Sequence, residues 1–194
     1  MSSMTRKIRN VARGLIQRRG TPAMKRRLWD WEFRHGRWIC LDDTPDDPAY
    51  PYLRQYVAGG RILDLGCGPG SAGRHLDPTT YRSYVGVDIS QIAIEQARQK
   101  DSRRQNSYVQ SDLLSYCPDD AYEVILLGDS LYYIPRPDAL GMLRRYAQCL
   151  ARGGVFIVKM HDAPGYRPFF QLIRDHFEVI AEHPHPPVIV IVFR

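Results

Sequence analysis

The sequence predicts an α/β protein with a doubly wound, mostly parallel sheet that ends in an antiparallel hairpin. The first observation is the alternation of strand-like apolar runs with helix-like segments between residues 61 and 160, which is typical of a parallel sheet with helices on both faces. The second is the segment 177–194, FEVIAEHPHPPVIVIVFR, which contains two strands and a proline turn but no room for a helix. The third is a glycine-rich loop directly after the first strand.

Five strands and two helices are expected before the hairpin. The strand-like runs are 61–66, 83–89, 106–112, 122–128 and 154–160. A helix is expected over 90–100, where Ser90 is a suitable N-cap, and another over 137–151, before Gly153-Gly154.

Length and composition indicate one globular domain with a sizeable core. The chain has 194 residues, of which 44% are apolar and 25% are charged. No apolar run approaches the roughly 20 residues of a membrane span, and no secretory signal is visible. The four cysteines are scattered without CxxC spacing. We therefore expect a cytoplasmic protein with reduced thiols and no structural metal.

The basic charge is concentrated at the N-terminus. Residues 1–37 hold 11 Lys/Arg and two acids, although the whole chain carries a net charge of only +6. Apolar residues recur there at helical spacing, at Ile8, Val11, Ala12, Leu15 and Ile16. Such an arm fits a helix that caps the domain, a peripheral membrane contact or an organelle transit peptide. Its charge could also attract RNA.

An aromatic segment follows the basic arm. Trp29, Trp31 and Trp38 lie within ten residues and suggest a segment that packs on the body or covers a pocket. The turn-rich DDTPDDPAYP then separates this segment from the alternating pattern. We expect a basic helical arm with an aromatic lid over 1–46, and the main domain over 47–194.

The loop LDLGCGPGSAG, residues 63–73, predicts a ligand site. Ligands of doubly wound folds bind outside the C-terminal ends of the strands, and glycines let a ligand approach the backbone closely. Gly68, Gly70 and Gly73 match GxGxxG, and Asp88, about 20 residues on, suits the hydroxyls of a ribose. A dinucleotide would fit this pattern. However, Asp64 just before the loop favours a cationic ligand over a pyrophosphate.

Five segments, in order, resemble class I S-adenosylmethionine-dependent methyltransferases: ILDLGCGPG, VGVDIS, SDLL, VILLGDSLYYI and LARGGVFIVKM. The resemblance covers about residues 60–194 and implies a seven-stranded Rossmann-like sheet that binds S-adenosylmethionine. Only Arg152 departs, where the family usually has proline, and this residue belongs to a turn. The resemblance implies that the cofactor contacts are Asp64, Gly66, Gly68 and Gly70 at the methionine part, Asp88 at the ribose, Ile89, Asp112 and Leu113 at the adenine, and Gly128 beside the sulfonium.

The sequence is least informative about which residues take part in catalysis. A sulfonium already activates its methyl group, so the protein mainly positions the reactants and removes water. A base is needed only where the acceptor must lose a proton. The candidates are Asp129, Tyr132 and His161, which follow strands four and five. His161 has an unperturbed pKa near neutrality, but it also fits a surface loop, and Tyr132 also fits a packing role.

The sequence favours methyl transfer to an O or N atom of a small molecule, with the segment 29–41 closing over it as a lid. The absence of [DN]PPY after strand four argues against amino methylation of a nucleobase. An RNA ribose 2′-O methyltransferase is the second hypothesis, because Asp129 and Lys159 match the central pair of its Lys-Asp-Lys-Glu tetrad. That tetrad lacks its first Lys, for which Arg54 is the nearest substitute, and its Glu. A catalytically silent S-adenosylmethionine-binding subunit is the third.

Overall fold

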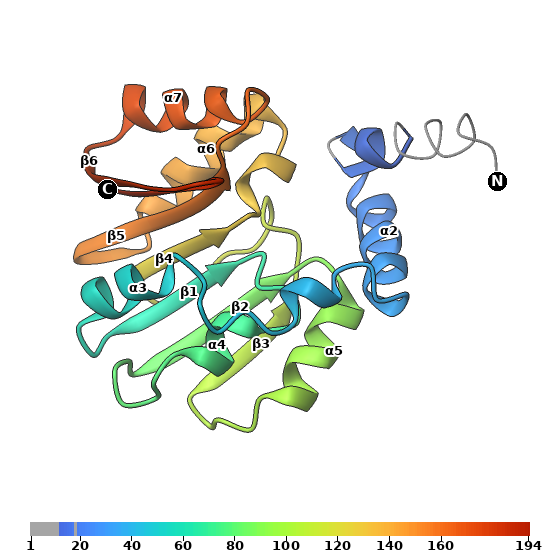
Figure 1. The fold of residues 1–194 in the computed structure, drawn as a ribbon, viewed down its shortest axis with the longest axis horizontal. Coiled ribbons are helices and arrows are strands. Elements are labelled where there is room, and N and C mark those ends of the chain that lie inside the picture. The colour runs from blue at the N-terminus through green and yellow to red at the C-terminus, as the bar shows by residue number, and fades with distance from the viewer. Residues whose placement is uncertain (1–11, 18) are drawn as a thin grey trace.

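The computed structural model describes residues 12–17 and 19–194, and its centre is a seven-stranded sheet (Figure 1). The strand order is β3-β2-β1-β4-β5-β7-β6. The strand β7 runs antiparallel to β5 and β6 on either side of it, and the other strand pairs are parallel. The predicted α/β fold with an antiparallel C-terminal hairpin is therefore confirmed. The strands are β1 Arg61–Leu65, β2 Ser83–Asp88, β3 Asn106–Gln110, β4 Tyr122–Gly128, β5 Leu150–His161, β6 Val179–His185 and β7 Val188–Phe193.

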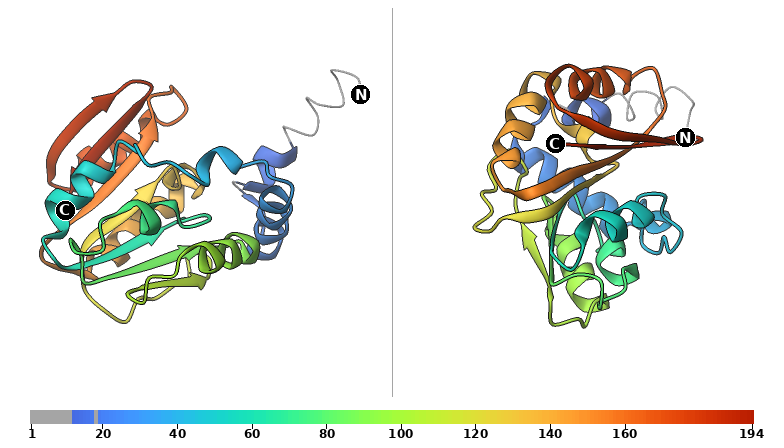
Figure 2. Two further views of the ribbon diagram at one scale, coloured as in Figure 1. Left: turned by 60° about the horizontal axis from the view of Figure 1, so that its bottom comes forward. Right: turned by 90° about the vertical axis from the view of Figure 1, so that its left-hand side faces the viewer.

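Helices cover both faces of the sheet (Figure 2). One face packs on α3, α4 and α5, and the other packs on α6 and α7. Side chains alternate between the faces along each central strand, so Ile62 belongs to the first apolar cluster while Leu63 belongs to the second. The helices of the body are α3 Tyr50–Val57, α4 Ser71–His75, α5 Gln91–Lys100, α6 Arg136–Ala147 and α7 Arg167–His176, with 3-10 turns η1 Ile39–Leu41 and η2 Leu131–Tyr133.

The helices α3 and α7 of the body were not predicted, and one predicted boundary is wrong. The helix α6 ends at Ala147, not at residue 151, and β5 already begins at Leu150. The cause is an early pairing of β5 with β4, in which Leu150 lies opposite Tyr122. The Tyr122 amide donates to the Cys149 carbonyl at 2.8 Å, and this contact draws the chain into the sheet four residues before the expected strand.

The N-terminal part forms a helix that the periodicity did not reveal. The helix α2, Pro22–Arg34, begins after Thr21, whose hydroxyl accepts from the Met24 amide at 3.3 Å, and it has proline at its first position. It lies across the C-terminal ends of the strands (Figure 1). Of the predicted arm helix, residues 12–17 are helical, whereas Ile8 and Val11 lie outside the described residues. No helix in the described part of the chain is long and apolar enough to cross a membrane.

Candidate active site

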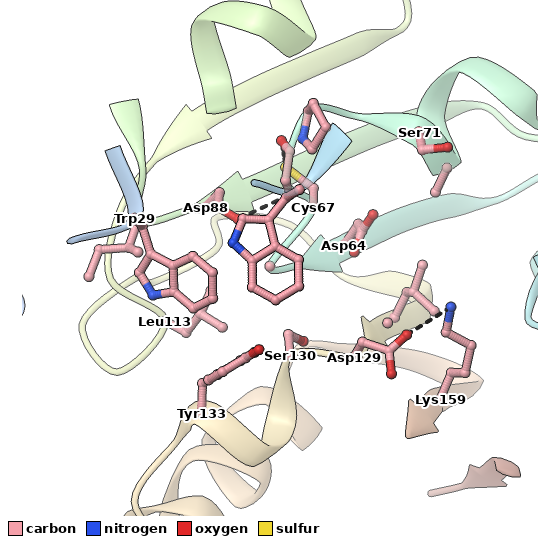
Figure 3. A pocket seen from close by; sticks show the side chains of 18 of the residues that line it. Trp29, Asp64, Cys67, Ser71, Asp88, Leu113, Asp129, Ser130, Tyr133 and Lys159 are labelled. Atoms are coloured by element: carbon pink, nitrogen blue, oxygen red, sulfur yellow. Dashed lines mark hydrogen bonds and ion pairs between the residues drawn. The ribbon is translucent and has the colours of Figure 1, made fainter. Parts of the chain in front are cut away.

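A pocket lies between α2 and the C-terminal ends of β1, β2, β4 and β5 (Figure 3). It is lined by most of the predicted cofactor residues together with residues of the N-terminal segment. We call the described residues between 12 and 41 the lid. The predicted cofactor residues in the lining are Asp64, Gly66, Gly68, Asp88, Ile89, Asp112, Leu113 and Gly128.

The glycine loop is shaped by packing as well as by room for a ligand. Gly66 has a φ of +89°, and a Cβ there would overlap the Ser130 side chain that follows β4. Gly70 has a φ of +79° and begins α4, where a Cβ would lie 2.9 Å from Ala97 and Tyr108. Gly70 does not line the pocket. The absence of a side chain at Gly70 is explained by the packing of Ala97 and Tyr108 against it, and its predicted contact with the cofactor stays a prediction.

Two buried carboxylates stand at the ends of β1 and β2. Asp88 accepts from the amides of Gly68 at 3.0 Å and Ser90 at 2.8 Å, and burial raises its pKa to about 6. Burial raises the pKa of Asp64 to about 7, although a 2.5 Å hydrogen bond from the Tyr84 hydroxyl partly opposes the shift. Both groups are thus costly to ionise where they lie.

The charge of the lining suits a cationic ligand. Five acids line the pocket, and the only cations among the described lining residues are Lys25 and Lys159. A positive group placed beside these acids would favour their ionised forms. A sulfonium with an amino group supplies such a charge, so the residues fit S-adenosylmethionine. The acids are Asp47, Asp64, Asp88, Asp112 and Asp129.

Lys159 at the end of β5 holds two of these acids. Its ammonium pairs with Asp129 at 2.9 Å and also with Asp47. Burial alone would lower the pKa of Lys159, but Asp129 and Asp47 raise it above its usual value. Asp129 has a φ of +56°, rare outside glycine, and its Oδ1 is buried with no partner in the described structure. The backbone of Asp129 is therefore strained, and its carboxylate has one oxygen, Oδ1, without a hydrogen-bond partner in the described structure.

The three predicted catalytic residues do not lie together. Asp129 and Tyr132 line the pocket, whereas His161 is exposed and does not. The Tyr132 ring stacks on Tyr166 with 4.2 Å between centroids, and burial raises the pKa of Tyr132. The Tyr132 hydroxyl therefore stays protonated, and its ring lines the pocket. Of the three residues, Asp129 is the candidate for proton transfer, because it lines the pocket with an unpartnered oxygen.

Aromatic side chains attach the lid to the pocket. Trp29 meets the edge of Tyr133 at 4.9 Å and packs on Trp38 at 5.7 Å. A Cβ built on Gly68 would lie 3.7 Å from the Phe33 ring. Trp29, Phe33 and Trp38 all line the pocket, and closure of the segment 29–41 over a ligand stays a prediction.

Polar groups of the lid were missed by the sequence analysis. Glu32 is fully buried and accepts from Trp38 Nε1 at 2.6 Å and Arg13 Nη2 at 3.1 Å. Lys25 lines the pocket from the same helix face as Trp29 and Glu32. Their spacing of i, i+4 and i+7 along α2 was the signal that could have found them.

Asp30 joins the lid to the cofactor side of the body. Its Oδ1 accepts from the Ser90 hydroxyl at 2.8 Å and the Ile92 amide at 3.2 Å, at the start of α5. Ser90 in turn donates its amide to Asp88. The lid therefore caps the helix that follows the predicted ribose acid.

The fold and this site place the chain among the class I S-adenosylmethionine-dependent methyltransferases. Residues 62–154 match the family model described as "Methyltransferase domain". A trans-aconitate 2-methyltransferase of Rhodopseudomonas palustris (strain HaA2) is 31% identical over 136 residues, which are 69% of this chain and 51% of that protein. A 27-O-demethylrifamycin SV methyltransferase of Amycolatopsis mediterranei is 27% identical over 139 residues, 66% of this chain and 50% of that protein.

Solved structures share the fold. A DhpI complex with S-adenosylhomocysteine (SAH) has a TM-score of 0.70 at 16% identity and covers 86% of this chain and 92% of its own. The N-methyltransferase NodS from Bradyrhizobium japonicum WM9 with SAH has a TM-score of 0.66 at 17% identity, covering 81% and 90%. The chain spans about half the length of the curated relatives it matches.

Proposed function

We propose that this protein transfers the methyl group of S-adenosylmethionine to an O or N atom of a small organic molecule. The observation that carries the proposal is the pocket itself. It joins the glycine loop and Asp88 to the free carboxylate oxygen of Asp129, and α2 covers it. Such an arrangement excludes water and holds two reactants in line, which is most of what this reaction requires.

The body residues would hold the cofactor. Asp88 accepts from the ribose hydroxyls, and Ile89, Asp112 and Leu113 face the adenine. The acids Asp64 and Asp129 lie where the positive charge of the sulfonium and amino groups would be. The cofactor supplies an activated methyl group, and the protein supplies the orientation.

Asp129 would receive the proton that a hydroxyl or amine acceptor loses. Its Oδ2 is held by Lys159 at 2.9 Å, so Oδ1 is the oxygen left to contact an acceptor. The rings of Tyr132 and Trp29 line the same pocket and add apolar surface for an acceptor. The names of two relatives give small-molecule substrates, trans-aconitate and a demethylrifamycin, and support an acceptor of this size.

One observation favours the RNA alternative. Asp129 and Lys159 form the ion pair expected of the centre of the tetrad. The remaining partner of Lys159, however, is Asp47, and Arg54 is exposed on α3 away from the pocket. These contacts favour a small acceptor over an RNA chain.

The test combines binding with transfer. Calorimetry with SAH measures cofactor binding, and a labelled-methyl screen covers organic acids, phenols, amines and RNA. We expect SAH binding and label on a small molecule. Asp129→Asn should reduce transfer at least about tenfold at saturating cofactor, while the exposed Asp119→Asn should change neither transfer nor SAH affinity. Absence of SAH binding contradicts the proposal, label on RNA alone supports the second hypothesis, and SAH binding without any transfer supports the silent subunit.

A further inference from the structure

We propose that the methyl acceptor carries a carboxylate, and that Lys25 and Gln17 of the lid bind this group. The inference rests on the proposed function, because it names the chemical class of the acceptor for the same pocket. Two buried donors without partners, both on the lid, carry it.

Lys25 is the first donor. It is 9% exposed and lines the pocket, yet no ion pair or hydrogen bond joins its side chain to another residue in the described part of the chain. Lys159, the other cation of the described lining, already holds Asp47 and Asp129. An ammonium that lines a pocket and has no counter-ion in the described structure is available to bind an anionic group of a ligand. We therefore expect the acceptor to supply the negative charge.

Gln17 is the second donor. It lies in the helical segment before α2, is 7% exposed and lines the same pocket. Its Nε2 is buried and has no hydrogen-bond partner in the described structure. An ammonium and an amide NH₂ that both line one pocket suit the two oxygens of a carboxylate.

The position along α2 separates these donors from the cofactor loop. Phe33 lies over Gly68, and Asp30 caps α5 next to Asp88, so the C-terminal half of α2 covers the cofactor residues. Lys25 precedes Phe33 by eight residues, or about 12 Å along the helix axis. Between them, Trp29 contacts Tyr133, which follows β4. Lys25 therefore lies beyond Trp29 as seen from the glycine loop, and the inference assigns the acceptor to this part of the pocket.

The charges of the body and the lid differ in sign within the pocket. The body contributes five acids, which attract the cationic cofactor and would repel an anionic acceptor. Lys25 places a positive charge on the opposite wall. An acceptor with a carboxylate would thus be oriented with its anion toward the lid and its reacting atom toward Asp129 and the cofactor.

The first measurement uses the unaltered protein saturated with SAH. SAH calorimetry is done first, since a protein that does not bind SAH contradicts the proposed function and not merely the acceptor class. Trans-aconitate and benzoate are then titrated against their neutral counterparts, trimethyl trans-aconitate and benzamide. We expect at least one carboxylate to bind and its neutral counterpart to bind about tenfold or more weakly. Equal binding of each pair, or no binding by either carboxylate, overturns the inference.

The second measurement compares Lys25→Met with Arg26→Met, which removes the same charge from an exposed neighbouring position. Lys25→Met should weaken carboxylate binding about tenfold or more, whereas Arg26→Met and the charge-retaining Lys25→Arg should change it less than about threefold. SAH affinity should stay constant in all three variants. A matching loss of SAH affinity in Lys25→Met would mean that Lys25 binds the carboxylate of the cofactor, and would overturn the inference.

Discussion

The sheet body and the lid are held by different kinds of contact. In the body, Leu63, Ile125 and Phe156 are fully buried within one of the two apolar clusters. In the lid, the buried side chains are Gln17, Lys25 and Glu32, all polar, and large apolar side chains such as Leu15 and Met24 are exposed. The same chain thus uses apolar burial in one region and a few directed polar contacts in the other.

This difference predicts that the two regions respond to separate substitutions. Burial of apolar area stabilises the body through many small and undirected contributions. The lid depends on the aromatic contacts of Trp29 and Phe33 and on a few hydrogen bonds and ion pairs. Each of these polar contacts fails when one partner is removed. A single polar substitution should therefore release the lid while the body stays folded.

The largest effect is expected from a body residue. Asp88→Ala should lower SAH affinity about 100-fold, because the ribose loses a charged acceptor and the amides of Gly68 and Ser90 lose theirs. Calorimetry with SAH measures the change, and the exposed Asp119→Ala is the matched control. An unaltered dissociation constant would show that Asp88 does not bind the ribose.

The next effect concerns the lid alone. Glu32→Ala should weaken closure of the lid by about 2 kcal/mol, because Arg13 and Trp38 lose their acceptor. Hydrogen exchange over residues 22–41 should then become about thirtyfold faster, with the amides of β1 and β4 as protected as before. The exposed Arg37→Ala serves as the control within the lid. Equal loss of protection in β1 and β4 would refute the separation of the two regions.

A pH dependence follows from the buried acids of the body. Burial raises the pKa of Asp64 to about 7 and of Asp88 to about 6, whereas both are near 4 in an unfolded chain. Between about pH 4 and 7 the folded protein therefore binds more protons than the unfolded chain, and these acids make its free energy of unfolding decrease as pH rises. Thermal unfolding of the cofactor-free protein should show this slope, and Asp64→Asn should flatten it.

The same acids make cofactor binding depend on pH in the opposite direction. The ammonium group and the ribose hydroxyls of SAH favour ionised carboxylates, so SAH affinity should increase by up to about tenfold per pH unit as pH rises toward 7. Calorimetry at pH 5.5, 6.5 and 7.5 measures this increase. An affinity that falls over this range would contradict the placement of the cofactor beside Asp64 and Asp88.

The smallest effect lies where the lid meets the body. Asp30→Ala should cost about 1 kcal/mol of lid docking, because the Ser90 hydroxyl and the Ile92 amide lose their acceptor. Asp30→Asn keeps an acceptor oxygen and should retain more of the docking. Hydrogen exchange at Ile92 reports the difference. Both variants should also lower the pKa of Asp88, since the charge of Asp30 contributes to raising it.

Most of the body could be read from the sequence because its signals are local. Apolar runs predict β1, β2 and β4 to within one or two residues, and Ser90 marks the start of α5. The hairpin at the C-terminus follows from the lack of room for a helix between its strands. The boundary between α6 and β5 could not be predicted, because the pairing of Leu150 with Tyr122 is a contact across the sheet.

The residues that line the pocket next to the glycine loop were predictable for the same reason, and Gly70 is the one predicted cofactor residue outside this lining. Asp64, Gly68 and Asp88 follow strand ends at characteristic spacings, and they line the pocket as expected. Gly70 has the same kind of signal, but its backbone faces Ala97 and Tyr108 instead. A glycine pattern identifies positions without a side chain and does not state which neighbour requires the space.

Local pattern therefore predicted the class of fold and the glycine loop at the pocket, and together with the family resemblance it predicted the acids that line this pocket, because strand periodicity and glycine spacing depend on residues close in the chain. Only the folded chain decided that Lys159 pairs with Asp47, that Glu32 is buried under Arg13 and Trp38, and that His161 lies outside the pocket. All three depend on how side chains pack in the folded protein, and Lys159 and Asp47 are 112 residues apart in the chain. Their energies depend on burial and distance in three dimensions, to which sequence spacing gives no access.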